Sequence, residues 1–340
     1  MAVTLTERPG VADGAGFSLE TLRLDAASET QRIGEALRTQ VLRRLRKRGV
    51  VLGLSGGIDS SVTAALAVQA LGPDKVLGEL MPERDSDAES LRLGRLVADS
   101  CGIATVTEDI EPILAAAGCY RRRDDFIRKL VPEFGPGWGC KLVIADALAN
   151  EGYNLTQLVV QSPDGTQQKL RMPLDIYLGI VAATNMKQRT RKGIEYYHAD
   201  RLNYAVAGTP NRLEYDQGFF VKNGDGAADV KPIAHLYKSQ VYQLAEHLDV
   251  PAEIRRRPPT TDTWSLAQTQ DEFYFSLPYD RMDLCLYGLA NGIAVDAVGR
   301  AAGLTVDQVE RVWRDIASKR RATRHLHEAP LLVDGVLPTD

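Results

Sequence analysis

Short apolar runs alternate with stretches of helical spacing along the first third of the chain. The run over residues 50–54 is typical of a strand buried in a parallel sheet, and two further strands are predicted over 76–81 and 104–107. Apolar positions recur at helical spacing over residues 19–48, 62–71 and 86–101. Ser86 is the expected N-cap of the last of these helices. The order predicts an α/β fold with a doubly wound, mostly parallel sheet.

The pattern changes between about residues 118 and 183. Apolar-alternating runs at 155–160 and 169–172 flank a Ser-Pro-Asp-Gly sequence, which is typical of a β-hairpin. We therefore expect an insertion that contains this hairpin and packs on the sheet. Beyond it, one more buried strand and several helices are predicted over 204–208, 239–248, 279–287, 296–303 and 305–318. The last helix begins at a Thr-Val-Asp-Gln cap.

A single α/β domain accounts for most of the chain. We place it over residues 18–330, between a loose leader over 1–17 and a tail over 331–340. The chain has 340 residues, 44% hydrophobic and 25% charged, which is typical of a folded globular protein. Its net charge of −4 provides no overall positive field for nucleic acid or anionic membranes.

Several other classes are disfavoured by what the sequence lacks. It has no apolar run of about 18 residues and no basic-then-apolar start, so we expect a cytoplasmic protein with neither a membrane nor a nucleic-acid partner. The four cysteines stand far apart without CxxC spacing, which argues against a zinc site or a disulfide framework.

The connection after the first strand has the composition of a phosphate-binding loop. It reads Gly-Leu-Ser-Gly-Gly-Ile-Asp-Ser-Ser over residues 53–61. Glycines let backbone N–H groups face an anion, and the start of the following helix favours negative charge. Neither GxxxxGK[ST] nor GxGxxG fits this sequence. The candidate nucleotide-binding residues here are Gly53, Ser55, Gly56, Gly57, Asp59 and Ser60.

Asp59 is the most informative residue of this loop. A carboxylate beside a phosphate cradle repels the ligand unless a divalent cation lies between them, so we interpret Asp59 as a Mg²⁺ ligand. Glu214 could bring a second carboxylate to the same cation, although a solvated glutamate is the alternative. Lys238, just before a helix, could neutralise departing phosphates, although a surface lysine is the alternative.

The loop resembles that of the PP-loop ATP pyrophosphatases, whose SGGxDS sequence holds the pyrophosphate end of ATP. A second group of segments is similar in order, spacing and content to the NAD synthetase family. These segments are 185–191, 208–214, 218–229, 232–233, 236–240 and 258–260. The resemblance covers about residues 20–115 and 183–330. It implies Mg²⁺ as cofactor, ATP as co-substrate, and amidation of nicotinic acid adenine dinucleotide by ammonia through an acyl adenylate, with release of AMP and pyrophosphate.

The same resemblance implies roles for single residues. It makes Asp59 and Glu214 the Mg²⁺ ligands, and Asp59 and Lys238 the catalytic residues. ATP is assigned to the loop together with Thr209, Lys238 and Thr260, and the acid dinucleotide to Arg189, Lys222, Asp229 and Lys319. It further implies a homodimer that uses free ammonia or ammonia from a separate glutaminase.

Two other functions stay open at this point. Pro210, Leu213 and the insertion depart from the family pattern near the acceptor side, which leaves a PP-loop amide ligase acting on a different carboxylic acid in a biosynthetic pathway. The second alternative is a non-catalytic nucleotide-binding protein. The ligase assignment requires Asp59 and Glu214, remote in the chain, to meet beside a loop that opens into a cleft.

Overall fold

The computed structural model describes residues 16–144, 156–260, 263–275 and 277–334. Within these residues, the centre is a parallel sheet of four strands in the order β3-β2-β1-β7. The strands are β1 (Val50–Gly53), β2 (Val76–Leu80), β3 (Ala104–Thr107) and β7 (Ala205–Val206). β1 pairs with β2 and β7, and β2 pairs with β3, all in parallel. The four strands that the sequence predicts are confirmed as neighbours in one sheet, with the mostly exposed β3 at its edge.

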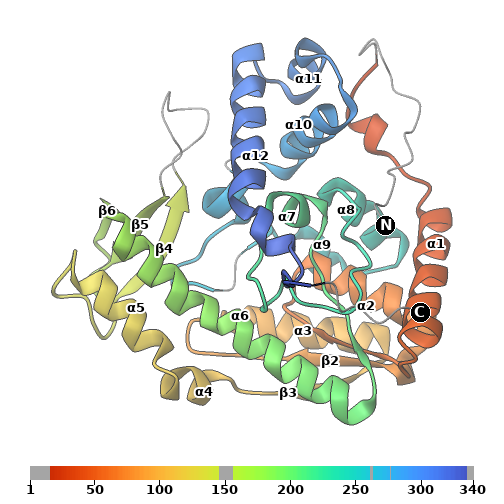
Figure 1. Ribbon diagram of the computed structural model, residues 1–340, viewed down its shortest axis with the longest axis horizontal. Coiled ribbons are helices and arrows are strands. Elements are labelled where there is room, and N and C mark those ends of the chain that lie inside the picture. Colours follow the sequence, from red (N-terminus) through yellow and green to blue (C-terminus); the bar gives the residue numbers. More distant parts are fainter. Residues whose placement is uncertain (1–15, 145–155, 261–262, 276, 335–340) are drawn as a thin grey trace.

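Helices cover both faces of this sheet (Figure 1). The helices of the larger core are α1 (Ala26–Arg38), α2 (Ile58–Leu71), α3 (Ala88–Cys101) and α8 (Lys238–His247). Val50 and Leu52 of β1 belong to that core, whereas Val51 packs on the other side with Ala199 of α6 (Leu174–Leu202). Because side chains alternate along a strand, an uninterrupted apolar run buries both faces. The doubly wound α/β arrangement is thereby confirmed.

The N-terminal helix is shorter than its sequence predicts. Residues 19–48 do not form one helix, because a 3₁₀ turn over Leu19–Leu22 precedes α1 and a π-helical turn over Thr39–Arg44 follows it. The side chain of Asp25 accepts a hydrogen bond from the backbone N–H of Ser28. This cap starts α1 after a break in the helical spacing.

Two predicted boundaries also differ from the structure. α3 is capped by Asp87, whose carboxylate accepts a hydrogen bond from the backbone N–H of Glu89, and not by Ser86. Phe17, placed in the leader from its sequence, is buried and stacks on Tyr287 with ring centroids 5.8 Å apart. Both differences come from side-chain contacts that a pattern of apolar positions does not contain.

The predicted insertion forms a sheet of its own. β4 (Gly139–Ile144), β5 (Thr156–Gln161) and β6 (Gln167–Arg171) pair antiparallel in that order, which confirms the predicted hairpin as β5 and β6. The expectation that this segment packs on the main sheet is wrong. Its apolar residues form a separate core with α5 (Cys119–Arg128) and the first part of α6. Since α6 runs unbroken through residue 183, the predicted end of the insertion lies inside a helix.

The C-terminal helices enclose another apolar core. They are α10 (Tyr279–Asn291), α11 (Val295–Ala302) and α12 (Val306–His327). The predicted cap of α12 is confirmed, because Thr305 and Gln308 each bond the other's backbone N–H. Shorter elements are α4 (Glu111–Ala116), α7 (Arg212–Gln217), α9 (Ala252–Arg256), a 3₁₀ turn over Pro73–Lys75 and a π-helical turn over Asp271–Phe275. None of the helices in the described ranges combines the length and the apolar composition of a membrane-spanning segment.

Candidate active site

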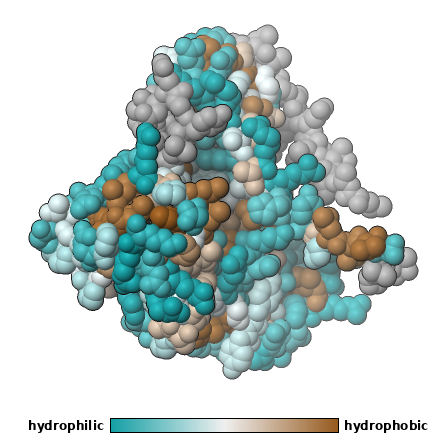
Figure 2. Space-filling view, turned by 60° about the vertical axis from the view of Figure 1, so that its left-hand side comes forward, coloured by the Kyte–Doolittle hydropathy of each residue, from teal (hydrophilic) through white to brown (hydrophobic). Residues whose placement is uncertain are grey.

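A cavity of about 1100 Å³ opens where the parallel strands end. The loop after β1 and the ends of β2 and β7 form its floor, and the insertion, α6 and α12 contribute to its walls. Figure 2 looks onto the face that carries the insertion, where apolar side chains gather beside a hollow. Open α/β sheets bind ligands at this edge. The volume lies just above the roughly 300–1,000 Å³ that is typical of a pocket for one drug-sized ligand.

The glycine-serine loop is held in a fixed turn at this floor. Gly56 has a φ of +70°, and a Cβ added to it would lie 2.7 Å from the backbone oxygen of Ser90 in α3. Only glycine fits such a close approach. The hydroxyl of Ser60 lies 3.1 Å from that of Ser55 and donates to the carbonyl oxygen of Gly57 at 3.0 Å. α2 begins at Ile58, within the 53–61 sequence, and its first residues line the cavity.

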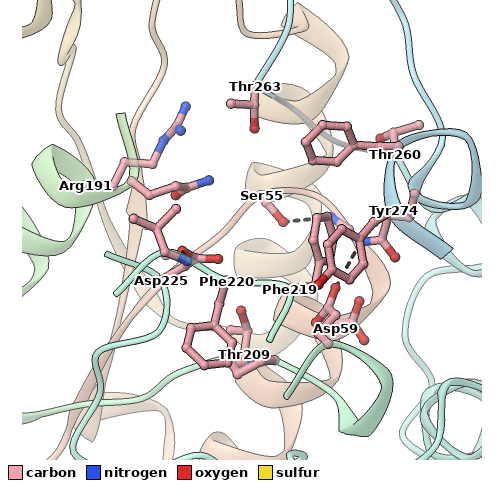
Figure 3. Close-up of a pocket in the computed structure, with 18 of the residues that line it drawn as sticks. Ser55, Asp59, Arg191, Thr209, Phe219, Phe220, Asp225, Thr260, Thr263 and Tyr274 are labelled. Atoms are coloured by element: carbon pink, nitrogen blue, oxygen red, sulfur yellow. Dashed lines mark hydrogen bonds between the residues drawn. The ribbon is translucent and has the colours of Figure 1, made fainter. Parts of the chain in front are cut away.

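Asp59 lies between a buried lysine and an asparagine. Its carboxylate pairs with the ammonium of Lys238 and accepts a hydrogen bond from Nδ2 of Asn211 at 3.0 Å. Burial opposes the charge on Lys238, but Asp59 and Glu214 outweigh this effect and raise the pKa of its ammonium. The site therefore holds a fixed positive charge beside the loop. Figure 3 shows Asp59 at the cavity with Ser55.

Glu214 reaches the same place from α7. Asn211 caps α7 reciprocally, since its Oδ1 accepts from the N–H of Glu214 while its own N–H donates to Oε2 of Glu214 at 3.1 Å. Because the Asn211 amide also holds Asp59, two carboxylates remote in sequence converge on one residue. Burial and the neighbouring Asp59 raise the pKa of Glu214. The meeting of the two acids that the ligase assignment requires is present.

Most of the other predicted site residues also line the cavity. They are Gly53, Ser55, Gly57, Ser60, Arg189, Thr209, Lys222, Thr260 and Lys319. Gly56 lies behind the wall, against α3. Asp229 lies outside the wall as well, because its carboxylate accepts a hydrogen bond from the backbone N–H of Val206 at 2.8 Å. In this structure Asp229 supports the end of β7 and does not face the cavity.

The predicted substrate-binding cations make contacts within the chain. Lys319 donates to the carbonyl oxygen of Tyr274 at 2.6 Å, and burial lowers the pKa of its ammonium. Lys222 donates to the carbonyl oxygen of His325 at 2.7 Å, near the end of α12. Arg189 of α6 donates to the carbonyl oxygen of Lys222 at 3.2 Å. These contacts hold α12 and the segment before residue 223 beside α6.

The NAD synthase family model matches residues 29–129 and 145–329 of the chain. A relative from Rhizobium meliloti, an NH(3)-dependent NAD(+) synthetase, is 72% identical over 94% of this chain and 96% of the relative. The chain belongs to the NAD synthase family. A relative of the same name from Mesorhizobium japonicum is 63% identical over 92% of this chain and 98% of its own length. The family match includes residues 118–129 and 145–183, so most of the predicted insertion is part of the family pattern.

Solved structures agree on the fold of the NAD synthase family. The NH3-dependent NAD synthetase of Campylobacter jejuni has a TM-score of 0.59 at 21% identity and covers 92% of this chain and 100% of its own. An NMN synthetase from Francisella tularensis has the same TM-score at 22% identity, with the same coverage of both chains. At this level of identity, the likeness shows the shared fold alone.

The acidic residues of the site suit Mg²⁺. This ion prefers oxygen ligands and usually takes one or two carboxylates together with phosphate oxygens and water. Asp59 and Glu214 provide two carboxylates beside the loop. Within the described part of the chain, no group of three or more His, Cys, Asp or Glu residues could hold a metal ion. Two carboxylates leave the other positions around such a cation to phosphate oxygens and water.

Some residues of the site were missed by sequence reasoning. Asn211 had a readable signal, because Asn-Arg-Leu-Glu matches the pattern of a capping box. Phe219 and Tyr274 had none, since they are remote in sequence, yet their rings stack 4.6 Å apart on the cavity wall (Figure 3). An aromatic pair at that place offers a flat apolar surface to a planar ligand.

Glu79 of β2 is a buried carboxyl group on the cavity wall. Its side chain is 0% exposed, and neither carboxyl oxygen has a hydrogen-bond partner among the described residues. Its neighbour in register on β1 is Gly53, where an added Cβ would lie 3.3 Å from Oε1 of Glu195. Burial, with Glu195 and Glu108 nearby, raises the pKa of Glu79 to about 8. Glu79 is therefore mainly neutral at neutral pH.

Proposed function

We propose that the chain catalyses ATP-dependent amidation of nicotinic acid adenine dinucleotide by ammonia, which yields NAD, AMP and pyrophosphate. Curated relatives at 72%, 66% and 63% identity are all named NH(3)-dependent NAD(+) synthetases. The single observation in the structure that carries the proposal is the convergence of Asp59, Glu214 and Lys238 beside the glycine-serine loop. That arrangement concentrates charge where a triphosphate would lose pyrophosphate.

The chain's part in this reaction is positioning and charge neutralisation. A substrate carboxylate attacks the α-phosphorus of ATP, pyrophosphate leaves, and ammonia then displaces AMP from the acyl adenylate. The loop N–H groups and Lys238 bind the departing phosphates, and Thr209 and Thr260 bind ATP beside them. Arg189, Lys222 and Lys319 bind the acid dinucleotide at the other wall, where cations suit its phosphates and carboxylate.

Mg²⁺ belongs to the proposal as the cofactor of the ATP site. Asp59 and Glu214 would hold it, and when bound it neutralises phosphate charge and orients the triphosphate. The hydrogen bonds of Asn211 keep the two carboxylates side by side, although their like charges repel each other. This support from Asn211 fits a site that is prepared for a divalent cation.

We further propose a cytoplasmic homodimer that takes free ammonia or ammonia from a separate glutaminase. Leu174 and Leu178, one turn apart on α6, are 70% and 54% exposed, and such an apolar stripe is suited to a second copy of the chain. Light scattering of the purified protein would test this. A single-chain mass would contradict the homodimer.

Exchange of labelled pyrophosphate into ATP tests the proposed function most directly. With Mg²⁺ and nicotinic acid adenine dinucleotide but no ammonia, we expect exchange, and adding ammonium should convert the dinucleotide to NAD. Exchange that occurs only with another carboxylic acid would support the amide-ligase alternative. ATP binding without exchange for any acid would support the non-catalytic alternative.

A further inference from the structure

Lys187 of α6 joins two segments of the chain from a position behind the cavity wall. Its side chain is 1% exposed. Its ammonium lies 2.8 Å from Oε1 of Glu83, 2.6 Å from Oδ2 of Asp85 and 2.8 Å from the carbonyl oxygen of Thr263. Glu83 and Asp85 belong to the connection between β2 and α3, whereas Thr263 belongs to the segment after α9. All three hydrogens of the ammonium are therefore used.

Other buried side chains complete this cluster. The Tyr120 hydroxyl donates to Oε2 of Glu83 at 2.8 Å, and Nη1 of Arg123 donates to Oδ2 of Asp85 at 2.6 Å. The Glu83 and Asp85 side chains are 0% and 5% exposed. Two carboxylates thus face two cations away from water. Removing one member of such a cluster leaves an unpaired charge, which is strongly unfavourable.

The two segments that Lys187 joins form one rim of the cavity. Residues of these segments that line it include Pro82, Ser86, Asp87, Thr260, Thr263 and Trp264. At the outer edge, the Arg257 guanidinium lies 3.2 Å from the Asp87 carboxylate and ties the same segments a second time. This rim lies next to the phosphate-binding loop. Gly56 of the loop packs against the start of α3, and α3 follows directly on the connection that carries Glu83 and Asp85. It therefore borders the end of the cavity proposed for ATP.

We propose that Lys187 is a positioning residue for ATP. It touches no substrate, since it lies behind the wall, but it holds both rim segments in place before the nucleotide arrives. Because the rim is ordered before binding, less conformational entropy is lost when the nucleotide binds. The contacts of Lys187 with both segments therefore contribute to ATP affinity. This inference rests on the proposed function only in assigning ATP to that end of the cavity.

Lys187→Met tests the proposal by separating KM from kcat. We expect the KM for ATP to rise at least about tenfold, with kcat falling less than about threefold and the KM for the acid dinucleotide changing less than about twofold. Calorimetric affinity for α,β-methylene-ATP with Mg²⁺ should fall about tenfold in parallel. Lys187→Arg, which keeps the charge, should recover part of that affinity.

Two further variants separate positioning from simple loss of stability. Leu202→Ala removes a partly buried side chain at the far end of the same helix, in a cluster with Val51 and Val206 that contains no rim residue, and it should leave the KM for ATP unchanged. The triple variant Lys187→Met, Glu83→Gln and Asp85→Asn removes the carboxylate charges that Lys187→Met alone would leave unpaired. The two rim segments remain without their connection through Lys187. This triple variant should melt near wild type while its affinity for the ATP analogue stays low, and it carries the test if Lys187→Met does not fold.

Several results would overturn the proposal. These are wild-type nucleotide affinity in the triple variant, a raised KM for ATP in Leu202→Ala, and equal increases of both KM values in Lys187→Met. The calorimetric measurement needs no turnover. A wild-type protein that binds the analogue but makes no NAD would therefore refute the proposed function and leave the role of Lys187 to be judged by binding alone.

Discussion

Replacing Glu79 by glutamine should make the stability of the fold less dependent on pH. In the wild type, ionisation of Glu79 places a charge without a hydrogen-bond partner on a side chain that is 0% exposed. Burial, together with Glu195 and Glu108, raises its pKa from 4.5 to about 8. Glutamine has nearly the same shape and stays neutral at every pH, so the variant lacks this penalty.

The sign and size of the effect follow from proton linkage. Well below pH 4.5, both the folded and the unfolded chain carry the proton on Glu79, and its stabilising contribution is fully present. Between pH 4.5 and about 8 only the folded chain keeps the proton, so the free energy of unfolding falls by about 1.4 kcal/mol per pH unit. Above about pH 8 the ionisation of Glu79 lowers the free energy of unfolding of the wild type no further. Compared with the difference between the two proteins at low pH, the variant is then more stable than wild type by up to about 5 kcal/mol.

Urea unfolding followed by tryptophan fluorescence, at about pH 5, 7 and 9, measures this difference. The advantage of Glu79→Gln over wild type should grow steadily across that series. Glu310→Gln, on the exposed surface of α12, is the matched control and should run parallel to wild type. If Glu79→Gln also runs parallel to wild type, Glu79 ionises as easily in the fold as in the unfolded chain, and the reasoning from burial is wrong.

Three other outcomes are expected. Asp59→Asn and Glu214→Gln should each lower pyrophosphate exchange by at least about 100-fold, because each removes a proposed Mg²⁺ ligand; chelation by EDTA should abolish the wild-type exchange and added Mg²⁺ restore it. Exchange that survives chelation would contradict the metal assignment. Gly56→Ala places a Cβ 2.7 Å from the backbone oxygen of Ser90 at a φ of +70°. We therefore expect weaker ATP binding by calorimetry and a lower melting temperature. Unchanged values of both would show that the turn relaxes freely. Leu158→Ala, in the separate core of the insertion, should cost about 2–5 kcal/mol in urea unfolding and leave pyrophosphate exchange near wild type, whereas a large loss of exchange would tie that core to catalysis.

The sequence determined the elements whose causes are local. The apolar runs of the parallel strands, the turn between β5 and β6 and the Thr305 cap each depend on a few adjacent residues, and all are present. The order of glycines, serines and Asp59 likewise indicated a phosphate-binding loop before its surroundings were known. Backbone preference and hydrophobic period act over one or two turns of chain, so they can be read without the fold.

Only the tertiary structure decided which remote side chains meet. The contact of Asp59 with Asn211, and those of Lys187 with Glu83 and Asp85, each join residues 100 or more positions apart, and no spacing predicts them. The separate core of the insertion and the direction of the Asp229 side chain were decided in the same way. Such contacts depend on how strands and helices cross in space and on which charges burial forces to pair. The physical causes that select them act between elements and leave no periodic pattern within any one of them.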